Sequence, residues 1–260
     1  MIPDALAKQL RQHAYTRVGA FFSNTQRGPG RCAVCTAPTL VELCSGCAVQ
    51  RASYGPELAD LVVPLAYIRG WMTPRHQSEH HVWRYKHPVQ PSPGCLADLR
   101  LMMLAGTLLH GDCIARAVGS WWEVVTFVPS ATRSGTGHPV VELARQVGGT
   151  DAARILLDLG PGIHDEFRGP RPDRFVVPPE YVPVIAGRHV LVVDDTWVSG
   201  GKAQSAALAL KTAGAVRVTI ICIGRWLSYR WDDHRALIES LTDPYDAMRC
   251  PVTGGACPPR

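Results

Sequence analysis

The stretch that decides the fold is His189–Gly201, HVLVVDDTWVSGG, in which an uncharged aliphatic run leads into two adjacent carboxylates and a turn of small residues. The run Val190–Val193 has the composition of a strand that is buried on both faces of a parallel sheet. Asp194 and Asp195 follow at its carboxyl end, which is the edge of an open α/β sheet where ligands bind. The stretch therefore predicts a parallel α/β sheet with a ligand site at this edge.

The turn after the carboxylates has the composition of an anion-binding loop. Small residues let backbone N–H groups approach an anion, and a helix is expected directly behind them, from about Lys202 to Ala213. The N-terminus of a helix attracts phosphate through its unpaired N–H groups and its partial positive charge. The turn residues expected to contact a phosphate are Thr196, Val198, Ser199, Gly200, Gly201 and Lys202. For Lys202, a solvated side chain in the first helical turn is an equally good interpretation.

Two carboxylates beside such a turn would repel a bare phosphate, so the ligand should also carry groups that need hydrogen-bond acceptors. A ribose 5′-phosphate meets this requirement, because Asp194 and Asp195 can accept hydrogen bonds from two ribose hydroxyls, directly or through Mg²⁺. The alternative is a buried strand that ends in a helix cap formed by Asp195. That alternative explains neither the second carboxylate nor the glycine pair.

Four cysteines near the N-terminus have the spacing of a zinc site. Cys32, Cys35, Cys44 and Cys47 form two CxxC pairs separated by eight residues, which lets two knuckles close on one Zn²⁺. A four-thiolate site leaves no open coordination position, so the zinc is expected to be structural. The alternative is four unligated thiols.

Two further cysteines near the C-terminus, Cys250 and Cys257, flank the glycine-bearing segment PVTGGA. They form a candidate second metal site if His234 or another cysteine completes the ligand set. The alternative, a pair of ordinary thiols in a tail, is favoured over this site by the sequence alone. Cys95 and Cys113 carry no usable signal in the sequence.

Composition limits the class of protein. The chain has 260 residues, of which 46% are hydrophobic, enough to fill a core. The net charge of +5 suits anionic small molecules and leaves nucleic acid as an unsupported option. The apolar stretch Leu101–Leu109 is shorter than a membrane span, so no membrane partner is expected. The charged N-terminal segment predicts an amphipathic helix rather than a secretory signal, and we expect a cytoplasmic protein.

Alternation of strands and helices in the second half of the chain predicts an α/β fold with a parallel sheet flanked by helices. We expect an N-terminal helix over 1–30, the zinc module over 31–55, the α/β domain over 56–230, and a C-terminal helix with a cysteine-containing tail over 231–260. Within the α/β domain, helices are expected over 96–109 and 138–147, and strands over 121–128, 155–159, 175–177, 181–185 and 216–223.

The strand, carboxylate pair and turn at Val190–Gly201 resemble the signature of type I phosphoribosyltransferases, which bind phosphoribosyl pyrophosphate (PRPP). The order of pieces along the chain resembles the ComF-like family within that class. In this family a four-cysteine zinc segment precedes a Tyr-Lys motif, here Tyr85-Lys86, and a Val-Pro loop leads to a further motif, here altered to Gly137-His138-Pro139. The resemblance covers about residues 32–224.

The resemblance implies further contacts to PRPP. The loop after the Val-Pro pair is placed to meet the pyrophosphate through Ser130 and Arg133, and Lys86 is placed to reach PRPP or an acidic acceptor. The long loop from Gly160 to Arg174 is expected to close over the site with one of its arginines, namely Arg168, Arg171 or Arg174. For all of these cations, a solvated side chain is the alternative.

The resulting expectation is a Mg²⁺-dependent phosphoribosyltransferase that transfers phosphoribose to an unidentified nitrogenous acceptor. Three departures from the family pattern bear on activity: Val198 replaces a hydroxyl residue, Lys202 replaces another, and the Phe-Asn-Gln part of the Val-Pro loop motif is missing. The alternative is a non-catalytic protein that binds PRPP or a nucleotide and acts in DNA uptake or processing. Against this alternative, the sequence has no basic aromatic stripe of the kind that binds single strands, and Trp83, Tyr85 and Lys86 form its only compact cluster of that type.

Overall fold

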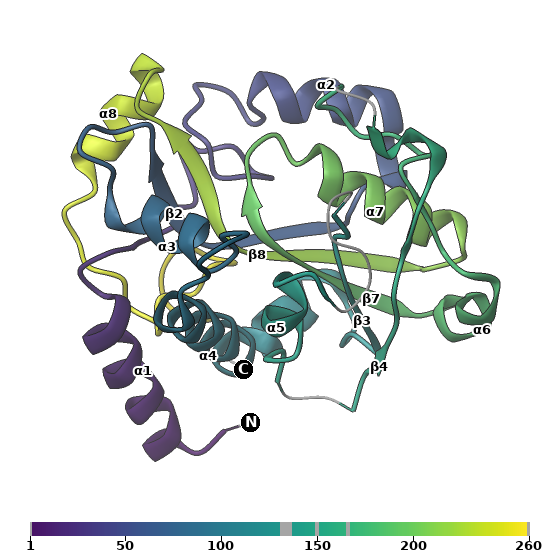
Figure 1. The fold of residues 1–260 in the computed structure, drawn as a ribbon, viewed down its shortest axis with the longest axis horizontal. Coiled ribbons are helices and arrows are strands. Elements are labelled where there is room, and N and C mark those ends of the chain that lie inside the picture. Colours follow the sequence, from purple (N-terminus) through teal and green to yellow (C-terminus); the bar gives the residue numbers. More distant parts are fainter. Residues whose placement is uncertain (1, 131–136, 149–150, 165–166, 259–260) are drawn as a thin grey trace.

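The computed structural model describes residues 2–130, 137–148, 151–164 and 167–258, and these residues form a six-stranded sheet with the order β1-β2-β8-β7-β3-β4 (Figure 1). The antiparallel strand β1 lies at one edge, and the other neighbouring strands pair in parallel. The predicted α/β class with a mostly parallel sheet is therefore confirmed. The strands are β1 (Ser23–Asn24), β2 (Leu61–Gly70), β3 (Val124–Phe127), β4 (Ala153–Arg154), β7 (His189–Trp197) and β8 (Arg217–Ser228).

Helices cover both faces of this sheet, and strand residues alternate between two cores. In β7, Leu191 and Val193 pack toward α4, whereas Val190 and Val192 pack toward α7. Helices α1, α3, α4 and α5 lie on the first face, and α2 and α7 lie on the second (Figure 1). The helices are α1 (Asp4–Val18), α2 (Ser45–Tyr54), α3 (Gln77–Arg84), α4 (Pro93–Val118), α5 (Val140–Ala144), α6 (Val182–Ile185), α7 (Gly201–Thr212) and α8 (Asp232–Ser240).

The longest helix, α4, is the core helix of the first face. The Ser92 hydroxyl accepts a hydrogen bond from the Cys95 N–H, Pro93 begins the helix, and Gly119 ends it in the left-handed conformation with φ 87°. By length and apolar composition α4 resembles a membrane span, but 61% of its most apolar window is buried within the protein. Its apolar residues are therefore explained by packing on the sheet and on neighbouring helices. The helix expected over 96–109 is confirmed and extends further at both ends.

The fold-deciding stretch forms the expected strand and helix. Strand β7 continues through both carboxylates to Trp197, and α7 begins at Gly201. The buried alanines of α7, including Ala203, Ala206 and Ala207, let this helix lie close to the sheet. The strand expected over 216–223 is confirmed as β8, which pairs in parallel with β7 and places Cys222 opposite Asp194.

Two expected strands differ in the structure. The stretch 155–159 does not form one strand, because β4 ends at Arg154 and the next strand, β5 (Asp158–Leu159), pairs with β6 (Phe175–Val176) in a separate two-stranded sheet. The strand expected over 181–185 is wrong. Pro183 stands in the first turn of the short helix α6, a position that proline favours because its missing N–H has no helical partner there.

Candidate functional site

The site lies where the chain connections diverge from two neighbouring strands. Strands β3 and β7 run in parallel with Phe127 opposite Val193, so Ser130 and Asp194 follow at the same edge of the sheet. The chain leaves β3 through α5 toward β4 on one side, and it leaves β7 through α7 toward β8 on the other. Diverging connections of this kind open a crevice at the carboxyl ends of the strands.

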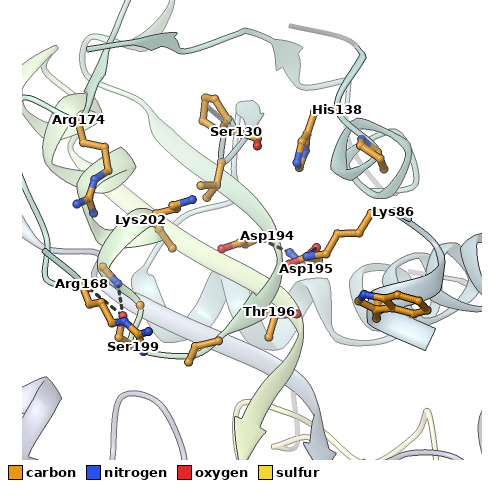
Figure 2. A pocket seen from close by; sticks show the side chains of 18 of the residues that line it. Lys86, Ser130, His138, Arg168, Arg174, Asp194, Asp195, Thr196, Ser199 and Lys202 are labelled. Atoms are coloured by element: carbon orange, nitrogen blue, oxygen red, sulfur yellow. Dashed lines mark hydrogen bonds and ion pairs between the residues drawn. The ribbon is translucent and has the colours of Figure 1, made fainter. Parts of the chain in front are cut away.

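A cavity of about 1010 Å³ occupies this crevice (Figure 2). Four segments that are far apart in the sequence line it: the end of α3 with the residues after it, the loop after β3, the segment before β6, and the turn between β7 and α7. The residues predicted from the sequence that line the cavity are Lys86, Ser130, Arg168, Arg174, Asp194, Asp195, Thr196, Val198, Ser199, Gly200, Gly201 and Lys202. Arg133 lies outside the described residues, and Arg171 is not among the lining residues.

The two carboxylates have different surroundings because successive side chains of a strand point to opposite faces. Asp195 lies on the α4 face, where its Oδ2 accepts hydrogen bonds from Tyr85 Oη at 2.5 Å and from Lys86 Nζ at 2.5 Å. The Oδ1 of Asp194 accepts a hydrogen bond from the Asp195 backbone N–H at 2.8 Å. In Figure 2, Asp194 points toward the Lys202 side of the cavity, and Asp195 points toward Lys86.

These surroundings separate the protonation of the two acids. Burial, followed by the neighbouring charge of Asp195, raises the pKa of Asp194 to about 7. Burial also acts to raise the pKa of Asp195, but the charge of Lys86 and the hydrogen bonds from Lys86 and Tyr85 outweigh it and hold that pKa below its ordinary value. The ligand-free site therefore keeps one carboxylate charged and paired, while the other takes up a proton near neutral pH.

The backbone of the turn after β7 is held from behind. The Arg225 guanidinium donates to the carbonyl oxygens of Trp197 at 3.1 Å and Val198 at 2.8 Å, and Gln50 Nε2 donates to the carbonyl oxygen of Ser199 at 2.8 Å. Neither donor lines the cavity. The turn at the start of α7 is thus held in place by residues that lie outside the cavity lining.

The segment before β6 packs directly on this turn. Ser199 Oγ donates to the carbonyl oxygen of Arg168 at 2.9 Å, and a Cβ added at Gly201 would lie 1.9 Å from that same oxygen. The buried guanidinium of Arg174 donates to the carbonyl oxygens of Phe167 at 2.7 Å and Gly169 at 3.0 Å. Arg174 therefore supports the segment itself. Arg171 forms an ion pair with Asp173 at 2.8 Å.

The buried hydroxyl of Thr196 has a particular place in this cavity. Thr196 Oγ1 is among the buried polar side-chain atoms for which the described part of the chain supplies no hydrogen-bond partner. A buried polar group of this kind carries a desolvation penalty unless a ligand or water satisfies it. Thr196 lines the cavity next to the carboxylates, while its hydroxyl oxygen is itself buried.

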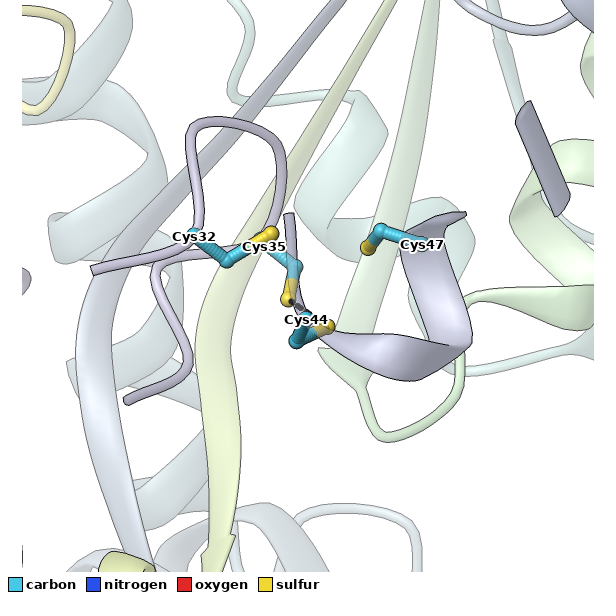
Figure 3. A group of neighbouring side chains, drawn as sticks. All are labelled: Cys32, Cys35, Cys44 and Cys47. Carbon is cyan, nitrogen blue, oxygen red and sulfur yellow. Dashed lines mark hydrogen bonds between the residues drawn. The ribbon is translucent and has the colours of Figure 1, made fainter. Parts of the chain in front are cut away.

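The four N-terminal cysteines come together in space (Figure 3). Their sulfur atoms all lie within 4.8 Å of one another, and the Sγ atoms of Cys35 and Cys44 are 3.7 Å apart. Four thiolates at about 2.3 Å from a tetrahedral zinc are separated by roughly 3.8 Å, so this set fits the ion. Cys44 caps α2 and Cys47 lies within it, one turn before Gln50. The group therefore lies directly behind the Ser199 carbonyl.

The structure also shows functional residues that the sequence did not reveal. Gln50 and Arg225 act through backbone carbonyls, which leave no motif in a sequence. His110 and Cys113 lie beside Cys250 and Cys257, and together they form a second group of potential metal ligands. Their one-turn spacing on a helix was the available signal. His234 is not part of that group, because its Nδ1 accepts a hydrogen bond from the Ser228 N–H at 2.9 Å.

Comparisons with known proteins give a distant likeness. No family model matches the chain, and no curated protein matches it. Among solved structures, the chain is similar to the allosteric regulatory enzyme of purine biosynthesis, with 18% identity, a TM-score of 0.34, and coverage of 55% of this chain and 30% of that one. It is also similar to a phosphoribosyltransferase from Corynebacterium diphtheriae, with 19% identity, a TM-score of 0.29, and coverage of 53% and 81%.

A third similar structure is adenine phosphoribosyltransferase from Leishmania donovani, with 16% identity, a TM-score of 0.30, and coverage of 58% of this chain and 60% of that one. Two of the three structures thus carry the name phosphoribosyltransferase. The matched regions cover 53–58% of this chain at 16–19% sequence identity.

We predict that Asp194→Asn stabilises the ligand-free protein at pH 8 and that this gain disappears as the pH falls. A carboxyl group whose pKa is raised in the folded state contributes stability below its unfolded value, near 4, and loses that contribution as the pH rises through about 7. Asparagine removes this pH-dependent loss. Thermal unfolding at pH 5, 6.5 and 8 measures it, with the exposed Asp232→Asn as control. A Tm difference that does not change between pH 5 and pH 8 would contradict the prediction.

We predict that Gly201→Ala destabilises the protein by about 1–3 kcal/mol, because the new Cβ meets a backbone oxygen that cannot move without displacing its segment. Proteolysis within the segment before β6 should become faster as well. Gly94→Ala is the matched control, since a Cβ there meets only the Ser92 hydroxyl at 3.8 Å. Equal Tm values for the two variants would show that the segment does not depend on this contact.

Proposed function

We propose that this protein binds Mg²⁺-PRPP in the cavity at the end of β7 and transfers its phosphoribosyl group to a nitrogenous acceptor. One observation carries the proposal. A single cavity collects two adjacent carboxylates, an anion-binding turn at the start of a helix, and cationic side chains from two other segments. Each of these parts matches one part of PRPP: the ribose hydroxyls, the 5′-phosphate and the pyrophosphate.

In this proposal the sugar lies between Asp194 and Asp195, which accept hydrogen bonds from its two hydroxyls. The backbone N–H groups of the turn hold the 5′-phosphate together with the charge of Lys202. The carboxylates also offer the oxygen ligands that Mg²⁺ prefers, so the donor chemistry of the site fits a magnesium complex of the substrate.

The pyrophosphate would meet cationic side chains of the cavity. Lys86 lines it on the Asp195 side, and Arg168 lines it beside Ser199, across from Lys86 (Figure 2). Ser130, which follows β3, also lines the cavity. Arg133, predicted for the same role, lies outside the described residues. Magnesium would supply charge neutralisation for the departing pyrophosphate. The cationic side chains would complete that neutralisation.

Lys86 has a second role in this proposal. In the ligand-free structure it neutralises Asp195, the acid that would accept a ribose hydroxyl. Arrival of the sugar supplies Asp195 with new partners, which frees the ammonium group to turn toward the pyrophosphate. The bond between ribose C1 and the pyrophosphate oxygen then breaks while the acceptor nitrogen bonds to C1 from the opposite face. Here the protein acts by orientation and electrostatics.

The acceptor side is supported by flat and apolar groups around the same cavity. Trp83, His87, His138 and Phe167 line it together with prolines at 88, 129 and 139. The rings of His138 and Phe127 are stacked and nearly parallel, with an interplanar angle of 7° and a centroid distance of 6.5 Å. Aromatic surfaces of this kind stack on planar nitrogen heterocycles. A heterocyclic base therefore suits this side of the cavity.

A second function, binding of PRPP or a nucleotide without transfer in DNA uptake or processing, is favoured by one observation. Val198 exposes an aliphatic side chain at the turn where the family carries a hydroxyl residue. Loss of that hydroxyl would weaken the grip on the 5′-phosphate without removing the carboxylates. Measurement of pyrophosphate release separates the two functions, because only the transferase releases it.

We predict that calorimetry detects binding of PRPP in the presence of Mg²⁺ and that the double variant Asp194→Asn, Asp195→Asn weakens this binding about 100-fold or more. Each acid would lose at least one charge-assisted hydrogen bond, worth about 1.5–3 kcal/mol. The exposed Asp232→Asn is the control. An absence of binding heat for the wild type removes support for the whole proposal. Binding without pyrophosphate release, across a panel of amines and bases, favours the non-catalytic function.

We further propose that the four N-terminal thiolates hold a structural Zn²⁺ and that Gln50 connects this centre to the phosphate turn. Gln50→Ala should weaken PRPP binding about 2–10-fold, because one hydrogen bond that holds the Ser199 carbonyl is lost. Zinc content, measured by elemental analysis, should not change. Gln12→Ala on the exposed face of α1 is the matched control. Equal affinities in the two variants would exclude the connection.

A further inference from the structure

A second group of potential metal ligands lies far from the cavity, at the junction of α4 with the C-terminal segment. His110 and Cys113 are one turn apart on α4, and Cys250 and Cys257 stand at the two ends of a short loop. The donor atoms of all four side chains lie within 4.8 Å of one another. This is the separation that a four-coordinate centre requires.

The histidine is already oriented as a ligand. His110 Nε2 lies 2.8 Å from the carbonyl oxygen of Ala247, and a carbonyl oxygen only accepts hydrogen bonds. In the neutral ring the proton is therefore on Nε2, which leaves the lone pair on Nδ1 for a metal ion. Nδ1 lies 3.3 Å from the Sγ of Cys257. Histidines that bind metals donate their other ring N–H to a carbonyl or carboxylate in the same way.

The loop between the two C-terminal cysteines is folded so that both reach the same point. The Cys250 N–H donates to the carbonyl oxygen of Gly255, and the Gly254 N–H donates to the carbonyl oxygen of Cys250, both at 2.8 Å. Gly254 has φ 80°, and a Cβ at this residue would lie 2.8 Å from the backbone nitrogen of Arg27. The loop thus requires glycine in order to pack while it presents its two thiols.

The composition and burial of the group favour a closed structural centre over a disulfide. Cys250, Cys113 and His110 are buried, and Cys257 is exposed at the rim. A disulfide would use two of the three thiols and leave the third beside an imidazole lone pair without a role. It would also need an oxidant. A tetrahedral ion uses all four donors, and three thiolates with one imidazole are a common structural zinc set.

We propose that His110, Cys113, Cys250 and Cys257 bind a second structural Zn²⁺ that fastens the C-terminal segment to α4. After α8 ends at Ser240, this segment forms only turns within the described residues. It buries Tyr245 and Ala247 in the core beside α1 and α4. A metal centre compensates for the regular backbone hydrogen bonding that such a segment lacks. The inference is independent of what binds in the cavity.

Elemental analysis of the full-length protein, purified under reducing conditions, tests this inference. We expect two zinc ions per chain in the wild type and one in Cys257→Ser, which removes the exposed ligand with the least disturbance of packing. Cys95→Ser, a cysteine of α4 outside both groups, is the matched control and should retain two. One zinc in the wild type and one in Cys257→Ser would overturn the proposal. Two in both would also overturn it.

A second measurement keeps the proposal testable if Cys257→Ser does not fold. With both centres filled, seven of the nine cysteines are ligands, and the other two, Cys95 and Cys222, are buried. A thiol reagent should therefore modify no cysteine rapidly in the native protein. Titration of the wild type with an organomercurial should release two zinc ions per chain. Release of one ion, or peptide mass analysis that finds Cys250 in a disulfide, would overturn the proposal.

Discussion

The arrangement of the site depends on two neighbouring carboxylates at the end of a buried strand. Burial of a charged carboxylate is unfavourable unless a partner neutralises it, and here the alternation of the strand sends the two acids to different partners. Asp195 meets Lys86 and Tyr85, whereas Asp194 has the raised pKa. The negative charge of Asp194 is therefore unfavourable in this buried position. A ligand that brings hydroxyl groups and a cation would stabilise that charge, and this is the chemistry that we propose for the site.

The phosphate turn depends on residues that never contact the ligand. Arg225 on β8 and Gln50 on α2 hold three successive carbonyl oxygens of the turn, and the segment around Arg168 packs on its other side. Through Gln50, the four-cysteine group becomes part of the support for the site. The N-terminal cysteines thus have a structural reason to stand beside a ligand cavity although they contribute nothing to its lining.

The sequence predicted the parts of the fold and of the site that have a local residue pattern of their own. The buried run before Asp194, the small-residue turn and the CxxC pairs each carry their own structural signal. The structure places both carboxylates, the turn residues and Lys86 around one cavity, but not Arg171. The sequence analysis did not identify strand β2, because Pro64 interrupts it. In the structure Pro64 lies opposite Cys222 of β8, and β1 pairs only with Ala66 and Tyr67 of β2. Contacts such as Lys86 with Asp195 depend on tertiary packing and have no local signal.

The side chain of Arg27 joins the two segments that carry the cysteine groups. The Arg27 guanidinium donates to the carbonyl oxygens of Ala33 in the first cysteine hairpin, Val62 in β2 and Pro251 in the C-terminal loop. These three carbonyl oxygens belong to segments that are far apart in the sequence. One planar group with several donors satisfies all three acceptors, so displacement of either cysteine loop would break a hydrogen bond of Arg27. The two proposed zinc centres would therefore stabilise one continuous layer of the fold rather than two separate appendages.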